Sequence, residues 1–176
     1  MPWDAPGSTA IVVLALEAEP VVGEWYATNS QAGAEGMAPH VTLLVPFVPE
    51  PFLDESVRVR LETVFGAVAP FDYRLPRFER FEGGVLYLAP EPADPFAALI
   101  RSLMAEFPDY QPYDGVHDDV VPHLTVAVTS DDELVARITE EVELHLPVEC
   151  RAAEATVVAR GEDFKWRSRA QYPFGG

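Results

Sequence analysis

The order of apolar and polar residues predicts short strands separated by amphipathic helices along the whole chain. Aliphatic and β-branched residues dominate the predicted strands, and each predicted helix repeats its apolar side chains every three or four positions. Clusters of proline and glycine separate these segments. The predicted strands are residues 9–16, 40–47, 71–81, 85–88, 123–128, 155–160 and 164–172, and the predicted helices are residues 19–30, 53–68, 94–107 and 130–144.

Two of the helix starts have recognisable capping signals. Asp94 stands before Pro95, which is typical of an N-cap followed by proline in the first turn, where the missing amide would have no partner in any case. Ser130 and Glu133 have the spacing of a capping box. We therefore expect these two helices to begin at Asp94 and Ser130.

One short pattern, Pro-His-x-Thr, occurs twice, at residues 39–42 and 122–125. Each copy continues into aliphatic sequence, so both are predicted as strands. Because side chains alternate along a strand, His40 shares a face with Thr42, and His123 shares a face with Thr125. The chain contains four histidines and 17 prolines, and two such patterns by composition alone would be about a one in ten thousand event. The repeat predicts two strands that line one cleft.

The order of the elements predicts an α+β fold in a single domain that covers residues 1–176. Strand, helix, motif strand, helix and hairpin are followed by helix, motif strand, helix and hairpin, so the second half approximately repeats the first. We expect a bilobal protein with two pseudo-symmetric lobes of antiparallel sheet and outer helices around a central cleft. Each lobe should supply one His-x-Thr strand.

Composition indicates a globular protein that needs no covalent staple. The chain has 176 residues, 48% of them apolar, which is ordinary for a folded domain. Its one cysteine, Cys150, excludes an intramolecular disulfide, favours a reducing compartment and suits an apolar strand. The N-terminus lacks the basic start of a secretory signal, and the aliphatic run at 11–16 is too short for a bilayer. We expect a cytoplasmic monomer with no membrane contact.

Charge limits the class of ligand. The formal net charge is −17, and broad affinity for duplex DNA requires many lysines and arginines that neutralise phosphates. A small phosphorylated ligand in a cleft, such as a nucleotide or an RNA end, is compatible with this charge. His117 lies six residues before His123 and raises a metal-dependent hydrolase as an alternative. No dense cluster of Cys, Asp or Glu at zinc-like spacing accompanies the pair, so we expect neither a metal nor another cofactor.

The two motifs and this order of elements resemble the two-histidine (2H) phosphoesterase superfamily, in particular its bacterial 2′-5′ RNA ligase-like branch. The resemblance covers nearly the whole chain and is carried by residues 38–47, 107–113 and 122–126. It implies metal-independent action on 2′,3′-cyclic phosphates of nucleotides or RNA ends, with RNA ligation as the reverse reaction. Carried over by motif match, His40 and His123 would be the catalytic pair, and Thr42 and Thr125 would hold phosphate oxygens.

The residue types suit this chemistry without the resemblance. Hydrolysis of a cyclic phosphodiester needs one group that takes a proton from water and another that gives one to the leaving ribose oxygen, and two imidazoles meet both needs. Relatives often line the cleft with further aromatic or basic residues, whereas Val45 is aliphatic here. Tyr113, Lys165 and Trp166 are candidate substrate-binding residues by position. The alternative function is a binding module for nucleotides or RNA ends with little or no turnover.

Overall fold

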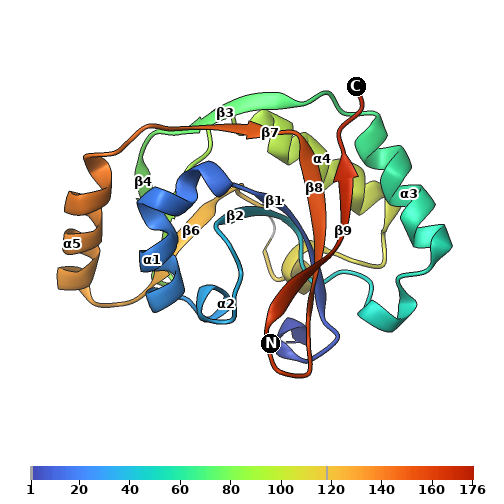
Figure 1. The fold of residues 1–176 in the computed structure, drawn as a ribbon, viewed down its shortest axis with the longest axis horizontal. Coiled ribbons are helices and arrows are strands. Elements are labelled where there is room, and N and C mark those ends of the chain that lie inside the picture. Colours follow the sequence, from blue (N-terminus) through green and yellow to red (C-terminus); the bar gives the residue numbers. More distant parts are fainter. Residues whose placement is uncertain (1, 118) are drawn as a thin grey trace.

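The computed structural model describes residues 2–117 and 119–176, which form two antiparallel sheets and five α-helices (Figure 1). The strands are β1 (Thr9–Leu14), β2 (His40–Leu44), β3 (Phe71–Leu75), β4 (Phe78–Arg80), β5 (Val85–Leu88), β6 (Leu124–Val128), β7 (Val148–Ala152), β8 (Glu154–Arg160) and β9 (Trp166–Pro173). The helices are α1 (Glu19–Asn29), α2 (Gln31–Ala34), α3 (Glu55–Gly66), α4 (Asp94–Glu106) and α5 (Asp132–Glu143). Short 3-10 turns link several of them.

The larger sheet brings the two motif strands together at its centre. Its strand order is β4-β5-β6-β2-β1-β8-β9, and every neighbouring pair is antiparallel. Strands β3 and β7 form a separate two-stranded antiparallel sheet. The direct pairing of β2 with β6 places both His-x-Thr motifs side by side.

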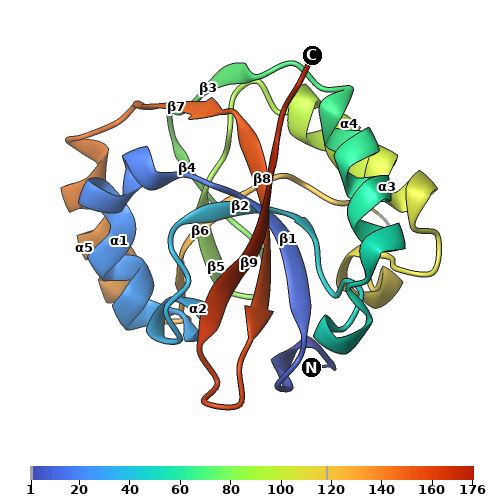
Figure 2. The same ribbon diagram turned by 45° about the vertical axis from the view of Figure 1, so that its right-hand side comes forward.

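The elements form two lobes, one on each side of the β2–β6 pair. Helices α1 and α5 contact each other, and α1 packs on β6, while α4 packs on β2 and α3 on β9. Figure 2 shows the pairs α1/α5 and α3/α4 on opposite sides of the molecule. This arrangement confirms the α+β fold with one His-x-Thr strand per lobe. The lobes interleave along the chain, because α1 lies between β1 and β2 in sequence yet packs in the other lobe with β6.

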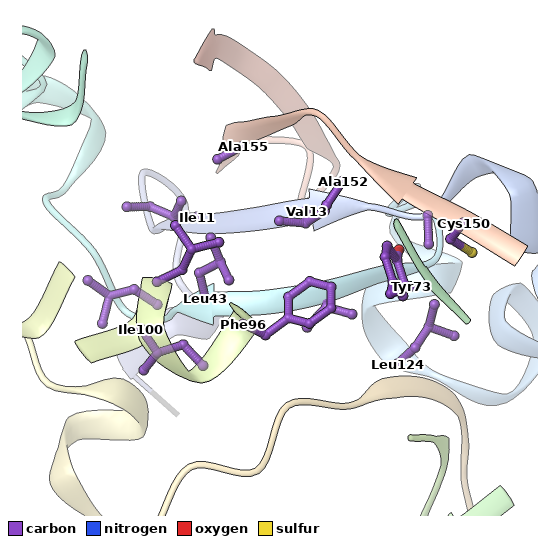
Figure 3. Packing of buried hydrophobic residues seen from close by; sticks show 14 of the residues in the cluster. Ile11, Val13, Leu43, Tyr73, Phe96, Ile100, Leu124, Cys150, Ala152 and Ala155 are labelled. Atoms are coloured by element: carbon purple, nitrogen blue, oxygen red, sulfur yellow. The ribbon is translucent and has the colours of Figure 1, made fainter. Parts of the chain in front are cut away.

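The main core lies between the central sheet and the helices. Figure 3 shows Ile11 and Val13 of β1 and Leu43 of β2 beside Phe96 and Ile100 of α4. Each of these five side chains is buried. Burying an aliphatic or aromatic side chain of this size stabilises the folded state by about 1.5–3 kcal/mol. Odd-numbered positions on β1 therefore face the helices and hold the sheet, which leaves the other face for the motif side chains.

Several local predictions required correction. Strand β7 was not predicted, although Cys150 within it is buried as expected of an apolar strand residue. The predicted capping box at Ser130 is wrong, because the Asp131 carboxylate caps α5 by accepting from the amides of Glu133 and Leu134 at 3.0 and 3.2 Å. A carboxylate placed one residue later also satisfies unpaired amides of the first turn. Asp94 is the first helical residue of α4 and not its N-cap.

No helix in the part of the chain that the structure describes is both long enough and apolar enough to cross a bilayer.

Candidate active site

The register of β2 against β6 places the four motif side chains on one face of the sheet. Val41 lies opposite Leu124 in this antiparallel pair, and both are fully buried on the helix side. Because the two strands run in opposite directions, the same register places His40 across from Thr125 and Thr42 across from His123. The four side chains, all partly buried, make a compact group in which each histidine faces the other strand's threonine.

Both imidazoles are oriented by the same backbone contact. The Nδ1 atom of His40 lies 2.8 Å from the carbonyl oxygen of Ala38, and Nδ1 of His123 lies 2.8 Å from that of Val121. A carbonyl only accepts hydrogen bonds, so each Nδ1 carries the proton and donates it. The remaining nitrogen, Nε2, is then the basic atom of each neutral ring. The two motifs thus present matching reactive nitrogens.

The fold favours the neutral form of both histidines. Burial lowers the pKa of His40 to about 4; the carbonyl of Ala38 opposes this shift, and the charge of a protonated His123 adds to it. Burial also lowers the pKa of His123, against the opposing effect of the Val121 carbonyl. An electrostatic effect of one ring on the other requires that they lie close together. Both shifts therefore favour the uncharged ring at neutral pH without a ligand.

Aromatic side chains surround the pair. The ring of Tyr26 contacts His40 with centroids 6.0 Å apart, and the ring of Phe81 meets His123 edge-on at 5.1 Å. Tyr87, which lies opposite Thr125 in the β5–β6 pairing, is 5.5 Å from His123 and stacks on Phe81 at 4.2 Å. Sequence reasoning missed these three aromatic residues. Tyr26 and Phe81 lie far from both motifs in the chain, so only strand pairing and helix packing bring them to the site.

Of the three candidate substrate-binding residues, Tyr113 lies at the motif group. Its backbone amide donates to the carbonyl of Val45 at 2.6 Å, and its side chain lies close to Thr42. Burial raises the pKa of Tyr113 to about 12, and the neighbouring Thr42 side chain acts in the opposite direction. Its φ of 52° is in the left-handed region, which is unusual for a residue with a side chain. Backbone strain of this kind occurs often at functional sites.

Lys165 lies in the turn between β8 and β9, and Trp166 is the first residue of β9; both contact residues of or next to α2. The ammonium of Lys165 donates to the carbonyl of Ala34 at 2.8 Å, and the backbone amide of Trp166 donates to that of Glu35 at 2.9 Å. The Trp166 side chain packs against a small apolar cluster that includes Tyr26 and Val45. The described contacts thus tie Lys165 to α2 and place Trp166 beside residues that border the motif group.

Metal ligation was a second possible use of the histidines. Within residues 2–117 and 119–176, no three side chains of His, Cys, Asp or Glu gather at distances that would hold a metal ion. His117 instead contacts the ring of Tyr113, with centroids 5.7 Å apart. The described side chains around the motif group are imidazoles, hydroxyls and aromatic rings.

Solved structures share this fold. The crystal structure of E. coli LigT complexed with 3′-AMP matches with a TM-score of 0.57 at 16% identity, over 98% of this chain and 100% of that chain. A crystal structure described as a phosphoesterase matches with a TM-score of 0.60 at 15% identity, over 98% and 100%. TT0787 of Thermus thermophilus matches with a TM-score of 0.67 at 16% identity, over 96% and 98%. No functionally curated protein matches the sequence significantly.

The sequence itself carries the family signal. The family model described as the 2′-5′ RNA ligase superfamily matches residues 14–164 of the sequence. This span contains both His-x-Thr motifs and the paired strands β2 and β6 that carry them. The match therefore covers most of the chain and the whole of the motif group. With this match and the shared fold, the chain belongs to the 2′-5′ RNA ligase superfamily, the two-histidine phosphoesterases.

Proposed function

We propose that the protein is a metal-independent phosphodiesterase that hydrolyses the 2′,3′-cyclic phosphates of nucleotides or RNA ends. The observation that carries the proposal is the β2–β6 register, which sets two imidazoles and two threonine hydroxyls on one face. Binding a phosphodiester would need only the hydroxyls. Two proton-transfer groups held in matching orientation serve acid–base catalysis, which binding alone does not need.

In the proposed reaction one imidazole acts as base and the other as acid. Nε2 of the first takes a proton from water as the water oxygen bonds to phosphorus, and Nε2 of the second gives a proton to the ribose oxygen as its bond to phosphorus breaks. The product is a ribose phosphomonoester with one free hydroxyl. When the 5′-hydroxyl of a second strand takes the place of water, the same two steps bond its oxygen to phosphorus and release the 3′ oxygen, which gives a 2′-5′ linkage.

The bound phosphate is proposed to raise the pKa of the imidazole that acts as the acid. Both imidazoles are neutral in the free protein because burial lowers their pKa values. A phosphodiester anion bound between His40 and His123 favours the protonated form of a neighbouring ring. Substrate binding therefore raises the pKa of an imidazole and recruits the proton that the leaving group requires.

Neutral donors are proposed to hold the phosphate oxygens. The hydroxyls of Thr42 and Thr125 share the face of the histidines, and the side chain of Tyr113 lies close to Thr42. These groups donate to oxygens on which negative charge grows in the transition state. Tyr113 is thus proposed as a third phosphate donor, and Trp166 as a more distant wall of the cleft.

Solved relatives are compatible with a small nucleotide as ligand. E. coli LigT has been crystallised with 3′-AMP, with NADP+ and with phosphate. The first of these is the kind of monophosphate that ring opening of a 2′,3′-cyclic phosphate yields. This likeness supports the proposal that a nucleotide or an RNA terminus is the substrate here.

Product analysis by phosphorus NMR tests the proposal. Purified protein in EDTA is incubated with 2′,3′-cyclic AMP, and wild type is compared with His40→Ala and His123→Ala. We expect conversion to one monophosphate isomer by wild type and a loss of kcat/KM of about 10³-fold or more in each variant.

His145→Ala is the matched control, because His145 is an exposed histidine after the end of α5. Its activity should equal that of wild type, and urea denaturation should show that all variants are folded. Full activity in either motif variant, or activity that EDTA abolishes, contradicts the two-histidine mechanism. Nucleotide binding without turnover by wild type would instead favour a binding module.

A further inference from the structure

A cavity of about 500 Å³ opens beside His123. The turn between β4 and β5 forms one wall with Phe81 and Glu82, and the segment before β6 forms another with Asp119 and Val121. A volume of this size lies within the range of small-molecule sites. Because His123 itself lines the cavity, a group bound there would lie next to a phosphate bound on the motif face.

Two aromatic residues line the cavity. Phe81 stacks on Tyr87 through one face, and its ring also meets His123 edge-on. Phe81 lines the cavity, as does Tyr113 from the neighbouring loop. Two planar rings at a cavity wall suit a planar ligand, since stacking of a base on an aromatic side chain contributes about 1–3 kcal/mol.

The turn that carries Glu82 is held in a defined conformation. The amide of Phe81 donates to the carbonyl of Val85 at 3.0 Å, and the amide of Gly84 donates back to that of Phe81 at 3.0 Å. Gly84 has a φ of 85°, and a Cβ there would lie 2.8 Å from the carbonyl oxygen of Thr129. No residue but glycine fits this position without strain. The hairpin therefore fixes the backbone position of Glu82 at the cavity rim, and its side chain is exposed there.

The rim is acidic. The described residues that line the cavity include the two acidic residues Glu82 and Asp119 and no lysine or arginine. In the described part of the chain neither carboxylate forms an ion pair, whereas the nearby Arg80 is engaged with Asp132 at 2.8 Å. A carboxylate accepts hydrogen bonds and repels other acceptors and anions. The rim thus favours a ligand group that donates hydrogen bonds.

We propose that this cavity binds the nucleobase of the substrate, and that Glu82 and Asp119 select bases with an exocyclic amino group over uracil. The proposal rests on the proposed function for the attachment of the base to a cyclic phosphate. Cytosine, adenine and guanine each donate an amino group to a carboxylate. Uracil presents a carbonyl oxygen at the position where cytosine has its amino group, and the carboxylates repel that oxygen.

Cytosine and uracil give the sharpest test, because they are equal in size and differ at this one position. We compare kcat/KM for 2′,3′-cyclic CMP and 2′,3′-cyclic UMP in wild type and in the double variant Glu82→Gln/Asp119→Asn. We expect wild type to prefer the cytidine substrate about tenfold, the size of one hydrogen bond to a charged acceptor. An amide donates as well as accepts, so the preference should fall to about twofold or less in the double variant.

The matched control is Glu140→Gln/Glu143→Gln, which removes two charges from exposed positions of α5. It should keep the preference of wild type. Equal turnover of the two substrates by wild type would overturn the base subsite and leave the proposed function standing. A preference that the Glu82 and Asp119 changes leave intact would overturn the role of these carboxylates.

A binding measurement tests the base subsite independently of turnover. If wild type turns over neither substrate, the proposed function fails, and calorimetric titration with 3′-CMP and 3′-UMP then tests whether the cavity prefers cytosine. Tighter binding of 3′-CMP, lost in the Glu82 and Asp119 double variant, would support it. Equal or absent binding of the two nucleotides would overturn it.

Discussion

The depressed pKa of His40 couples the stability of the protein to pH. Burial lowers this pKa from 6.5 to about 4 in the folded protein. In the unfolded chain the ring is solvated and titrates near its ordinary value, so between the two values the unfolded state binds more protons than the folded state. The stabilisation is therefore complete above the unfolded pKa and is lost as the pH falls toward 4.

The size of the effect follows from the two pKa values. Lowering the pH from 8 to 5 stabilises the unfolded state by about 2 kcal/mol, because this ring is protonated there. The same change hardly alters the free energy of the folded state, in which the ring stays neutral. Urea denaturation of wild type and His40→Gln at both pH values measures it, because carboxylates titrate in both proteins and cancel in the difference. We expect the free energy of unfolding of wild type to fall by about 2 kcal/mol more than that of the variant.

His145→Gln serves as the control, since this side chain is exposed. Its free energy of unfolding should follow that of wild type at both pH values. The reasoning is refuted if the difference between wild type and His40→Gln stays constant to within about 0.5 kcal/mol from pH 8 to pH 5. Such a result would mean that the folded protein protonates His40 as readily as the unfolded chain does.

Two further predictions concern the motif strands. Thr42→Val and Thr125→Val each remove a hydroxyl at nearly constant volume, so kcat/KM for 2′,3′-cyclic AMP should fall about 10- to 100-fold. The urea midpoint should stay near that of wild type. Unchanged kcat/KM would exclude these hydroxyls as phosphate donors. Leu124→Ala empties a fully buried position opposite Val41 and should lower the free energy of unfolding by about 3 kcal/mol. Leu144→Ala, at a side chain that is 80% exposed, should change it by less than about 0.5 kcal/mol, and equal losses in the two variants would contradict the packing described for β6.

The sequence by itself determined the motif strands, most helices and which side chains share a face. Alternation of side chains along a strand is a local property, so His40 and Thr42 could be placed on one face and Val41 on the other before any fold was known. Helical periodicity is equally local, and α3, α4 and α5 lie close to their predicted positions. The repeat of the motif, together with this order, also indicated the family and the two lobes.

The tertiary structure alone decided how the two motifs meet. Pairing of Val41 with Leu124 joins strands from distant parts of the chain, and no local pattern specifies a register between them. The same holds for β7, whose partner β3 is remote in sequence, and for Phe81, which reaches His123 only through the β4–β5–β6 pairing. Local preferences act over a few residues, whereas the pKa values and walls of a site depend on every element that packs against it.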